Sequence, residues 1–242
     1  MRLGVISDIH ANLPALEAVL AEIDDADVDE IWSLGDVVGY GADPDACAEA
    51  VAGRCTLSLV GNHDLGFLDA LDLSSFSPAA ADAVRWTQRT AASETLAYLR
   101  GLEPLDESRE AAAYHASPRD PVWEYVLWPE QAEECMAVQA ERVSLVGHSH
   151  LALHFGKVDG RVRAEAADAD ASLDISEGRW LLNPGSVGQP RDRDPRAAWL
   201  ELDTQAWHAT WRRVPYDIDR AVEAIVAAEL PEQLGRRLYS GQ

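Results

Sequence analysis

Residues 3–10, Leu3-Gly4-Val5-Ile6-Ser7-Asp8-Ile9-His10, are the stretch that decides the fold, because an apolar run ends abruptly in polar residues. The run has the length of a buried β-strand and is much too short for a membrane helix or a signal-peptide core. Asn12 follows as a helix N-cap with Pro14 in the first turn, which predicts a helix to about residue 24. Strand, polar loop and helix in this order are typical of an α/β protein.

The same unit is repeated along the first part of the chain. We predict further strands at 30–34, 55–60, 111–114 and 143–146, and helices at 43–52, from 77 to about 101, and at 129–140. The remainder differs, with successive strands at 151–155, 161–166, 180–182, 197–202 and 207–213 before a helix at 217–229. The pattern predicts βαβ crossovers followed by an antiparallel meander. No linker or low-complexity segment intervenes, so we expect one domain over 1–242 with two sheets.

Composition indicates a globular protein of the cytoplasm. Hydrophobic residues make up 47% of the 242 residues, enough for a sizeable core, and no apolar run approaches the ~18 residues of a membrane span. The first strand leaves no room for an export signal, so we expect a cytoplasmic protein that does not bind membranes. The three cysteines show no CxxC spacing and are interpreted as packing residues in a reducing compartment.

The charge balance is strongly acidic. Asp and Glu number 42 against 20 Lys and Arg, giving a net charge of −22, and Lys157 is the only lysine. Self-repulsion on this scale is relieved by salt, which suggests a halophilic source. An acidic protein from a GC-rich genome is the alternative, and melting at low and multimolar KCl separates the two. Duplex nucleic acid is excluded as a partner by the same charge.

Polar residues gather at the ends of five predicted strands. They are Asp8 and His10, then Asp36, then Asn62, His63 and Asp64, then His115, and finally His148 and His150. Ligands of open α/β sheets bind beyond the carboxyl ends of the strands, so we expect five neighbouring strands to bring these side chains to one crevice. Turn formation would explain the Asp and Asn residues. It does not explain why five of the seven histidines lie here, whereas His154 and His208 are interpreted as structural strand residues.

The residue types favour a metal site. A mixed set of carboxylate, imidazole and amide ligands suits borderline transition metals better than it suits Ca²⁺, and it differs from a thiolate-type site. Nine polar groups exceed the needs of one ion, whereas two ions about 3.5–4 Å apart would use them and could share a carboxylate.

These motifs resemble those of the calcineurin-like metallophosphoesterase superfamily. The resemblance covers about residues 1–203 and includes Asp8-x-His10, Gly35-Asp36, Gly61-Asn62-His63-Asp64, His115 and Gly147-His148-x-His150. The segments 117–121 and 183–188 are similar to turns of the small prokaryotic phosphodiesterases in that superfamily. Ala116 departs from the glycine that is frequent in those relatives, which affects a loop and removes no ligand.

The resemblance implies both a fold and a metal centre. The implied fold is a four-layer α/β/β/α sandwich with two mixed β-sheets flanked by helices. Asp8, His10 and His150 would hold a first divalent ion, Asn62, His115 and His148 a second, and Asp36 would bridge them. Mn²⁺ is the expected metal, and Fe, Zn, Ni or Co are compatible. Water or hydroxide between the ions would be the nucleophile.

Four further residues are candidates for catalysis or substrate binding. His63 is expected to act as a general acid, with Asp64 fixing its tautomer and orientation; a purely structural pair is the alternative. Arg119 and Arg191 are candidate phosphate contacts, although neighbouring aspartates also favour surface ion pairs.

Four of the eight tryptophans have a predicted role in substrate contacts or in the core. Trp123 and Trp128 are weak candidates for substrate contacts, whereas Trp207 and Trp211 are predicted to share a core-facing strand face.

The sequence therefore predicts a metal-dependent phosphoesterase that hydrolyses a small phosphodiester or nucleotide. Two alternatives remain open at this point. The first is a serine/threonine-type protein phosphatase, since Gly61-Asn62-His63-Asp64 also resembles that core. The second is a non-enzymatic scaffold of the same fold, which the presence of His63 disfavours.

Overall fold

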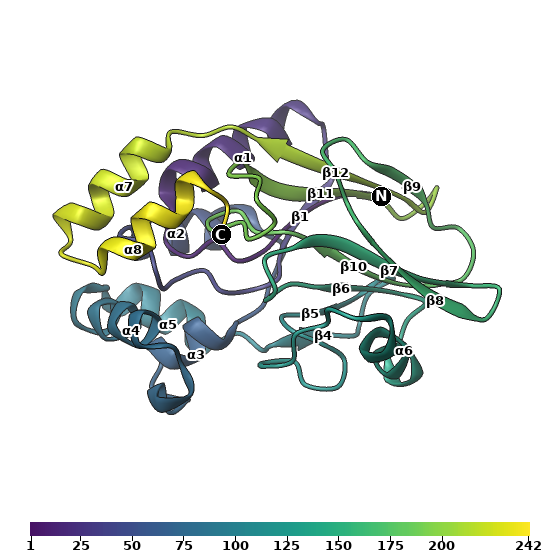
Figure 1. The fold of residues 1–242 in the computed structure, drawn as a ribbon, viewed down its shortest axis with the longest axis horizontal. Coiled ribbons are helices and arrows are strands. Elements are labelled where there is room, and N and C mark those ends of the chain that lie inside the picture. Colours follow the sequence, from purple (N-terminus) through teal and green to yellow (C-terminus); the bar gives the residue numbers. More distant parts are fainter.

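Two six-stranded sheets form the centre of the computed structural model, which describes residues 1–242 (Figure 1). The first sheet has the order β3-β2-β1-β11-β12-β9, with bounds Leu57–Ser58, Glu30–Ser33, Arg2–Ile6, Ala197–Asp203, His208–Val214 and Ser172–Asp174. The second has the order β4-β5-β6-β10-β7-β8, with bounds Leu105–Asp106, Ala112–Tyr114, Val143–Val146, Arg179–Pro184, Ala152–Val158 and Arg161–Ala166. Both sheets contain parallel and antiparallel pairs.

The alternation of side chains along the strands produces four layers. In β1, Leu3 and Val5 point into the apolar cluster between the two sheets, whereas Ile6 belongs to the cluster under the helices of the first sheet. In β5, Ala113 faces the space between the sheets and Tyr114 faces the opposite helical layer. Successive side chains of a strand point to opposite faces, so each central strand contributes to two cores. The expected α/β/β/α sandwich is confirmed.

Helices cover the outer face of each sheet. The first sheet carries α1 (Leu13–Asp25) and α2 (Pro44–Arg54), with α7 (Ile218–Ala227) packed beside α1. The second sheet carries α6 (Pro129–Val138). The remaining helices are α3 (Asn62–Phe67), α4 (Pro78–Thr90), α5 (Ser93–Arg100) and α8 (Glu232–Arg236). The Asn12 cap is formed as expected, since its Oδ1 accepts a hydrogen bond from the Ala15 amide at 3.2 Å.

The predicted antiparallel meander in the second half is confirmed only in part. β7 pairs antiparallel with β8 and β10, and β11 with β12, but these strands do not form one continuous meander. β10 runs parallel to β6, and β11 lies in the other sheet, antiparallel to β1. Both strands are buried on both faces, and such strands take central positions rather than following their sequence neighbours. The predictions also missed β4, β9 and α3, and placed Trp207 in a strand although it lies in the turn before β12.

The expected crevice is formed by both sheets rather than by five neighbouring strands of one. β1, β2 and β3 belong to the first sheet and β5 and β6 to the second. The two sets of carboxyl ends meet closely, since a Cβ on Gly61 would lie 2.0 Å from Asp36 Oδ1 and 2.6 Å from His115 Cε1. Residues from the two halves of the sandwich therefore converge on one place.

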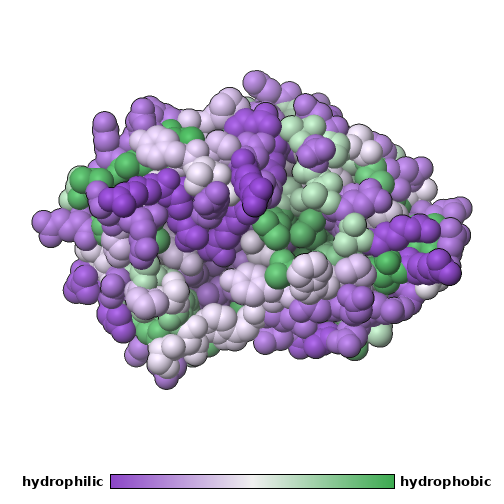
Figure 2. Space-filling view, viewed as in Figure 1, coloured by the Kyte–Doolittle hydropathy of each residue, from purple (hydrophilic) through white to green (hydrophobic).

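The visible surface is largely polar. Figure 2 shows a face that is mostly hydrophilic, with apolar side chains gathered in small patches. None of the helices is both long and apolar enough to span a bilayer.

Candidate metal centre and substrate cleft

Two groups of buried side chains meet at the junction of the two sheets. The first group consists of Asp8, His10, Asp36 and His150, and the second of Asp36, His115 and His148. In each group the candidate ligand atoms lie within 4.8 Å of one another. Asn62 joins the second group, with its Oδ1 3.3 Å from His115 Nε2. All seven residues expected as ligands are thus together, and Asp36 is common to both groups.

The backbone is in an unfavourable conformation at most of these positions. Asp8, His10, Asp36, His148 and His150 have φ values of 54°, 50°, 52°, 62° and 61°. Non-glycine residues rarely adopt this left-handed region, which costs about 1–3 kcal/mol each, and such residues cluster at functional sites. The sharp turns after the strands aim these side chains back into the crevice.

Backbone carbonyl groups fix the orientation of three histidine rings. The acceptors are Val38 O for His10 Nδ1 at 3.2 Å, Leu34 O for His115 Nδ1 at 2.9 Å, and Gln189 O for His150 Nδ1 at 2.6 Å. A ring that donates through Nδ1 carries its lone pair on Nε2, as in metal-binding histidines generally. His10 Nε2 and His150 Nε2 lie 3.1 Å apart, so two lone pairs face each other. A metal ion bound by both nitrogens would make such an approach favourable.

Asp8 and Asp36 each have one carboxylate oxygen that accepts a backbone hydrogen bond and one that faces the histidines. Asp36 Oδ1 accepts from the His63 amide at 2.8 Å, while Oδ2 lies 3.6 Å from His10 Nε2 and 3.7 Å from His115 Nε2. Asp8 Oδ2 accepts from the His148 amide at 3.1 Å, while Oδ1 is buried without a hydrogen-bond partner. His148 Nε2 is likewise buried and unpartnered. Buried polar atoms are rarely left without a partner, and these donor atoms fit divalent transition-metal ions.

The protein environment shifts the ionisation of these groups strongly. Burial, together with the Asp36 charge, raises the pKa of Asp8 to about 7. Burial and the Asp64 charge raise the pKa of Asp36 well above its usual range. Burial also lowers the pKa of His10, His148 and His150 well below the usual value, so these imidazoles are neutral ligands near neutral pH.

Metal affinity should therefore depend on the carboxylates rather than on the histidines. Binding requires Asp8 and Asp36, whose pKa values are both raised, to lose their protons, so affinity falls by about tenfold or more per pH unit below about pH 7. Calorimetric titration of Mn²⁺ in buffers of different ionisation enthalpy, between about pH 5 and pH 8, measures both the affinity and the released proton. An affinity that does not change over this range would contradict the expectation.

His63 lies beside the cluster without joining it. Its ring centroid is 4.8 Å from that of His10, 4.3 Å from Tyr40 and 5.3 Å from Phe76. Its Nδ1 is buried and has no hydrogen-bond partner. Burial and then the positive charge of Arg191 lower the pKa of His63 to about 3.

The expected pairing of Asp64 with His63 is not formed. Asp64 Oδ1 accepts from the Val38 amide at 3.0 Å, and Oδ2 accepts from the amides of Val37 at 3.2 Å and Gly61 at 2.9 Å. Consecutive residues of a helix point in different directions, so Asp64 faces away from His63 in α3. Asp64 is thus a positioning residue that ties the loop after β2 to the turn before α3.

Glycine is required twice in these turns. Gly39 has φ +88°, and a Cβ there would lie 2.4 Å from His63 Nδ1. Gly61 packs directly against Asp36 and His115, as described above. Any side chain at either position would displace a candidate ligand or His63.

A cleft of about 360 Å³ opens above the seven candidate metal ligands, which are together called the metal cluster. It is lined by Asp36, Tyr40, Asn62, His63, Ser75, Phe76, Ser77, Ala80, Trp123, Tyr125, His148, His150, Arg191 and Arg237. Arg191 and Trp123, two of the candidate substrate contacts, therefore line the cleft. Arg119 does not line the cleft and forms ion pairs with Glu124 and Glu134, and Trp128 is 65% exposed outside it.

Sequence reasoning missed several cleft residues. Tyr40, Phe76, Tyr125 and Arg237 belong to no motif and come from four separate segments. Tyr125 stacks on the His148 ring at 4.2 Å, and Phe76 meets Trp123 edge to face at 5.1 Å. One wall of the cleft is thus aromatic. The only signal in the sequence was the concentration of aromatic residues after His115.

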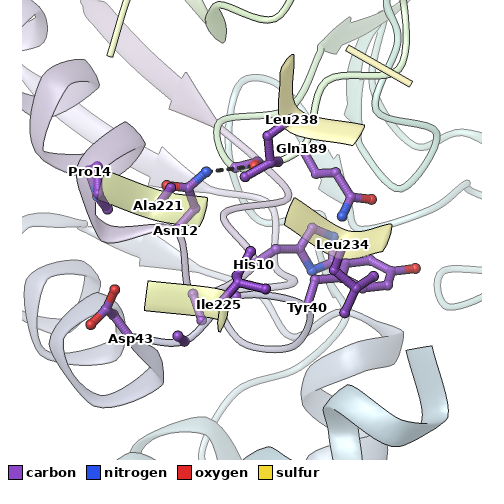
Figure 3. A pocket seen from close by; sticks show the side chains of 14 residues that line it. His10, Asn12, Pro14, Tyr40, Asp43, Gln189, Ala221, Ile225, Leu234 and Leu238 are labelled. Carbon is purple, nitrogen blue, oxygen red and sulfur yellow. Dashed lines mark hydrogen bonds between the residues drawn. The ribbon is translucent and has the colours of Figure 1, made fainter. Parts of the chain in front are cut away.

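A second, much smaller cavity of about 10 Å³ lies behind His10 (Figure 3). On one side Asn12 Nδ2 donates to Gly188 O at 2.8 Å, and on the other Ile225 and Leu234 from α7 and α8 close it. The C-terminal helices therefore seal the rear of the metal cluster from water.

Comparison with known proteins agrees with this site. Residues 1–205 match the family model of the calcineurin-like phosphoesterase superfamily domain. The chain belongs to this superfamily. A crystal structure of a metallophosphoesterase from Sphaerobacter thermophilus is 39% identical, covers 100% of this chain and 99% of its own, and superposes with a TM-score of 0.91.

Two further proteins, both archaeal, are similar to this chain over nearly its whole length. An uncharacterised protein of Methanocaldococcus jannaschii is 38% identical over 99% of this chain and 98% of its own length. A hypothetical protein from Pyrococcus horikoshii is 22% identical, covers 100% of this chain and 98% of its own, and shares the fold with a TM-score of 0.79. The family and the buried His/Asp groups indicate a phosphoesterase that binds divalent metal.

Proposed function

We propose that this protein is a hydrolase of small phosphate esters that uses two divalent cations, with Mn²⁺ as the expected metal. Asp8, His10 and His150 would hold one ion, Asn62, His115 and His148 the other, and Asp36 both. The observation that supports this best is the 3.1 Å approach of His10 Nε2 and His150 Nε2, each with its Nδ1 engaged by a carbonyl. A metal ion bound by both Nε2 atoms would make that arrangement favourable.

The chemistry is divided between the ions and the side chains. When bound, two such cations lower the pKa of a water between them and neutralise charge on the phosphate oxygens. Asp36 joins the contributions of the two sheets, because it lies near His10 from the first and His115 from the second. Arg191 contributes positive charge to the cleft and suits non-bridging phosphate oxygens.

His63 would donate a proton to the leaving oxygen. Its ring lies in the cleft wall between Tyr40 and Phe76, so packing fixes its position without an acidic partner. In the free protein it is neutral at pH 7, because burial holds its pKa near about 3. A bound phosphate would supply the negative charge that favours its protonated form.

The cleft favours a small molecule over a phosphoprotein. Its volume of about 360 Å³ falls within the range of small-ligand sites, roughly 300–1,000 Å³. An aromatic wall is formed by Phe76, Trp123 and Tyr125. Such a wall suits the planar base of a nucleotide, which also speaks against the protein-phosphatase alternative.

Turnover in the presence of metal is the direct test. We expect the metal-free protein to be inactive toward p-nitrophenyl phosphate and bis-p-nitrophenyl phosphate, and Mn²⁺ to restore hydrolysis of at least one of them. A phosphopeptide assayed in parallel should be a poorer substrate than nucleotides. Folded, metal-loaded protein that hydrolyses no ester would favour the scaffold alternative instead.

A further inference from the structure

The C-terminal segment supplies a side chain to the cleft. Arg237 begins the short 3₁₀ helix Arg237–Tyr239 after α8 and lines the cleft together with Arg191. It lies outside the part of the chain matched by the family model, residues 1–205. The segment that seals the rear of the metal cluster therefore also reaches its front.

Arg191 and Arg237 share a neutral partner, and neither pairs with an acidic side chain. Gln189 Oε1 accepts from Arg191 Nη2 at 2.9 Å and from Arg237 Nη1 at 3.1 Å. Arg191 Nη2 also donates to the Tyr40 hydroxyl at 3.4 Å, and Arg237 Nε donates to Gln242 O at 2.6 Å. No Asp or Glu oxygen lies within 4.0 Å of either guanidinium, although the chain has 42 acidic residues.

Two neighbouring guanidinium groups with no acidic side chain beside them repel each other. Burial, followed by the charge of Arg191, lowers the pKa of Arg237. Arg191 Nε is also buried and without a partner. Arginine side chains left in this state are suited to bind an anion, because an anion removes the repulsion and provides acceptors for the free N–H groups.

The two arginines lie at different distances from the metal cluster. Arg191 lies over the Tyr40 ring at 5.8 Å, and that ring is 4.6 Å from the His10 ring. Arg237 also lines a groove of about 600 Å³ formed by residues of α4, α8 and the C-terminal segment, and this groove shares Ser77 and Arg237 with the cleft. Arg237 is thus at the outer end of the cleft, where the groove begins.

The N-terminus of α4 adds positive potential at the same point. Ser77, which caps this 13-residue helix, lines both the cleft and the groove, as Arg237 does. Pro78 and Ala79 of the first turn line the groove. Pro78 has no N–H and the Ala80 amide donates to Ser77 Oγ, so the Ala79 amide and the helix dipole are what this terminus offers an anion, here opposite a guanidinium.

We propose that Arg237 and the first turn of α4 form a subsite for a second phosphate group, beyond the phosphate held at the metal cluster. This inference rests on the proposed function and names its substrate class. The substrates are phosphate esters with two or more phosphate groups, of the class of nucleoside di- and oligophosphates. The aromatic wall of Phe76, Trp123 and Tyr125 faces the same cleft and accommodates the base.

Binding of two non-hydrolysable nucleotide analogues tests the subsite. The α,β-methylene analogue of ADP and the phosphonate analogue of AMP share the nucleoside and differ in the number of phosphorus groups. Calorimetric titration of the Mn²⁺-loaded wild type should show about tenfold or more tighter binding of the ADP analogue, since a charge-assisted contact contributes on that scale. Arg237→Ala should lose this preference and bind the AMP analogue as the wild type does.

Arg236→Ala is the matched control. Arg236 is the adjacent residue, is exposed, and pairs with Glu232 on the surface, so its replacement should preserve the preference. An Arg237→Ala variant with the wild-type preference, or a wild type with no preference, would overturn the inference. The outcome is separate from catalysis. Tighter binding of the ADP analogue without ester hydrolysis would support the subsite and reject the proposed function. Ester hydrolysis without this preference would support the proposed function and reject the subsite.

Discussion

Replacing Asp36 by asparagine is expected to lower kcat/KM for phosphate esters by about a thousandfold or more. Asp36 Oδ2 is the one carboxylate oxygen that lies close to histidines of both candidate metal groups. An asparagine has a similar shape but carries no charge, so it cannot hold two cations together. The stabilisation that two-metal sites give to a phosphoryl transition state amounts to several kcal/mol, which corresponds to a loss of this size.

The same variant should fold as well as the wild type when metal is absent. Burial raises the pKa of Asp36, so its proton favours the native state at low pH, and this contribution is lost as pH rises through the raised pKa. Near neutral pH the buried carboxyl group of Asp36 therefore lowers the stability of the metal-free native state, and asparagine removes this cost. Metal-free Asp36→Asn should melt at the wild-type temperature or above it.

Added metal provides the contrast. Saturating Mn²⁺ should raise the melting temperature of the wild type by roughly 5–10 °C and that of Asp36→Asn by much less. Melting curves with and without Mn²⁺, together with the bound metal content, make the measurement. Wild-type activity in Asp36→Asn would exclude Asp36 as the shared ligand. A variant that melts far below the wild type without metal would instead point to a structural role.

Strand-end positions explain why the convergence of the candidate metal ligands could be predicted from the sequence. Asp8, Asp36 and His148 directly follow buried strands, and chain direction alone brings such residues to one edge of a sheet. Chain direction does not determine which of the two sheets a strand joins. The partition into two sheets depends on β10 and β11, whose insertion beside β6 and β1 is a long-range pairing without a local signal.

Substrate-side residues were harder to predict for a different reason. Arg237 belongs to the C-terminal segment, and its place in the cleft depends on how α7 and α8 pack behind His10. Arg119, by contrast, follows His115 closely in sequence but is drawn to Glu124 and Glu134 at the surface. Adjacency in sequence also misled for Asp64, whose carboxylate is occupied by three backbone amides.

Replacing His63 by asparagine should lower kcat by an amount that depends on the leaving group. General acid catalysis contributes about 10²–10⁴-fold, and it matters most when the departing oxygen is strongly basic. p-Nitrophenolate leaves readily without a proton, so the loss should be small for p-nitrophenyl esters and large for phenyl or alkyl esters. KM should change little, because Arg191 and the candidate metal ligands are untouched.

The pH dependence gives an independent check on the same residue. In the free protein burial and the Arg191 charge hold the pKa of His63 near about 3, so the ring is neutral above that value. The alkaline limb of kcat reports the complex instead, where a bound phosphate raises the pKa and sets the pH above which the proton is lost. This limb should be present for slow leaving groups in the wild type and absent in His63→Asn.

His208→Asn serves as the control for loss of an imidazole outside the cleft, since His208 lies in β12 and contacts Ser172. Its kinetics should match the wild type, and both variants should retain the wild-type metal content. Equal losses for all leaving groups in His63→Asn would mean that His63 orients the phosphate rather than protonating the departing oxygen. The ring of His63, held between Tyr40 and Phe76, would then donate a positioning hydrogen bond to the phosphate.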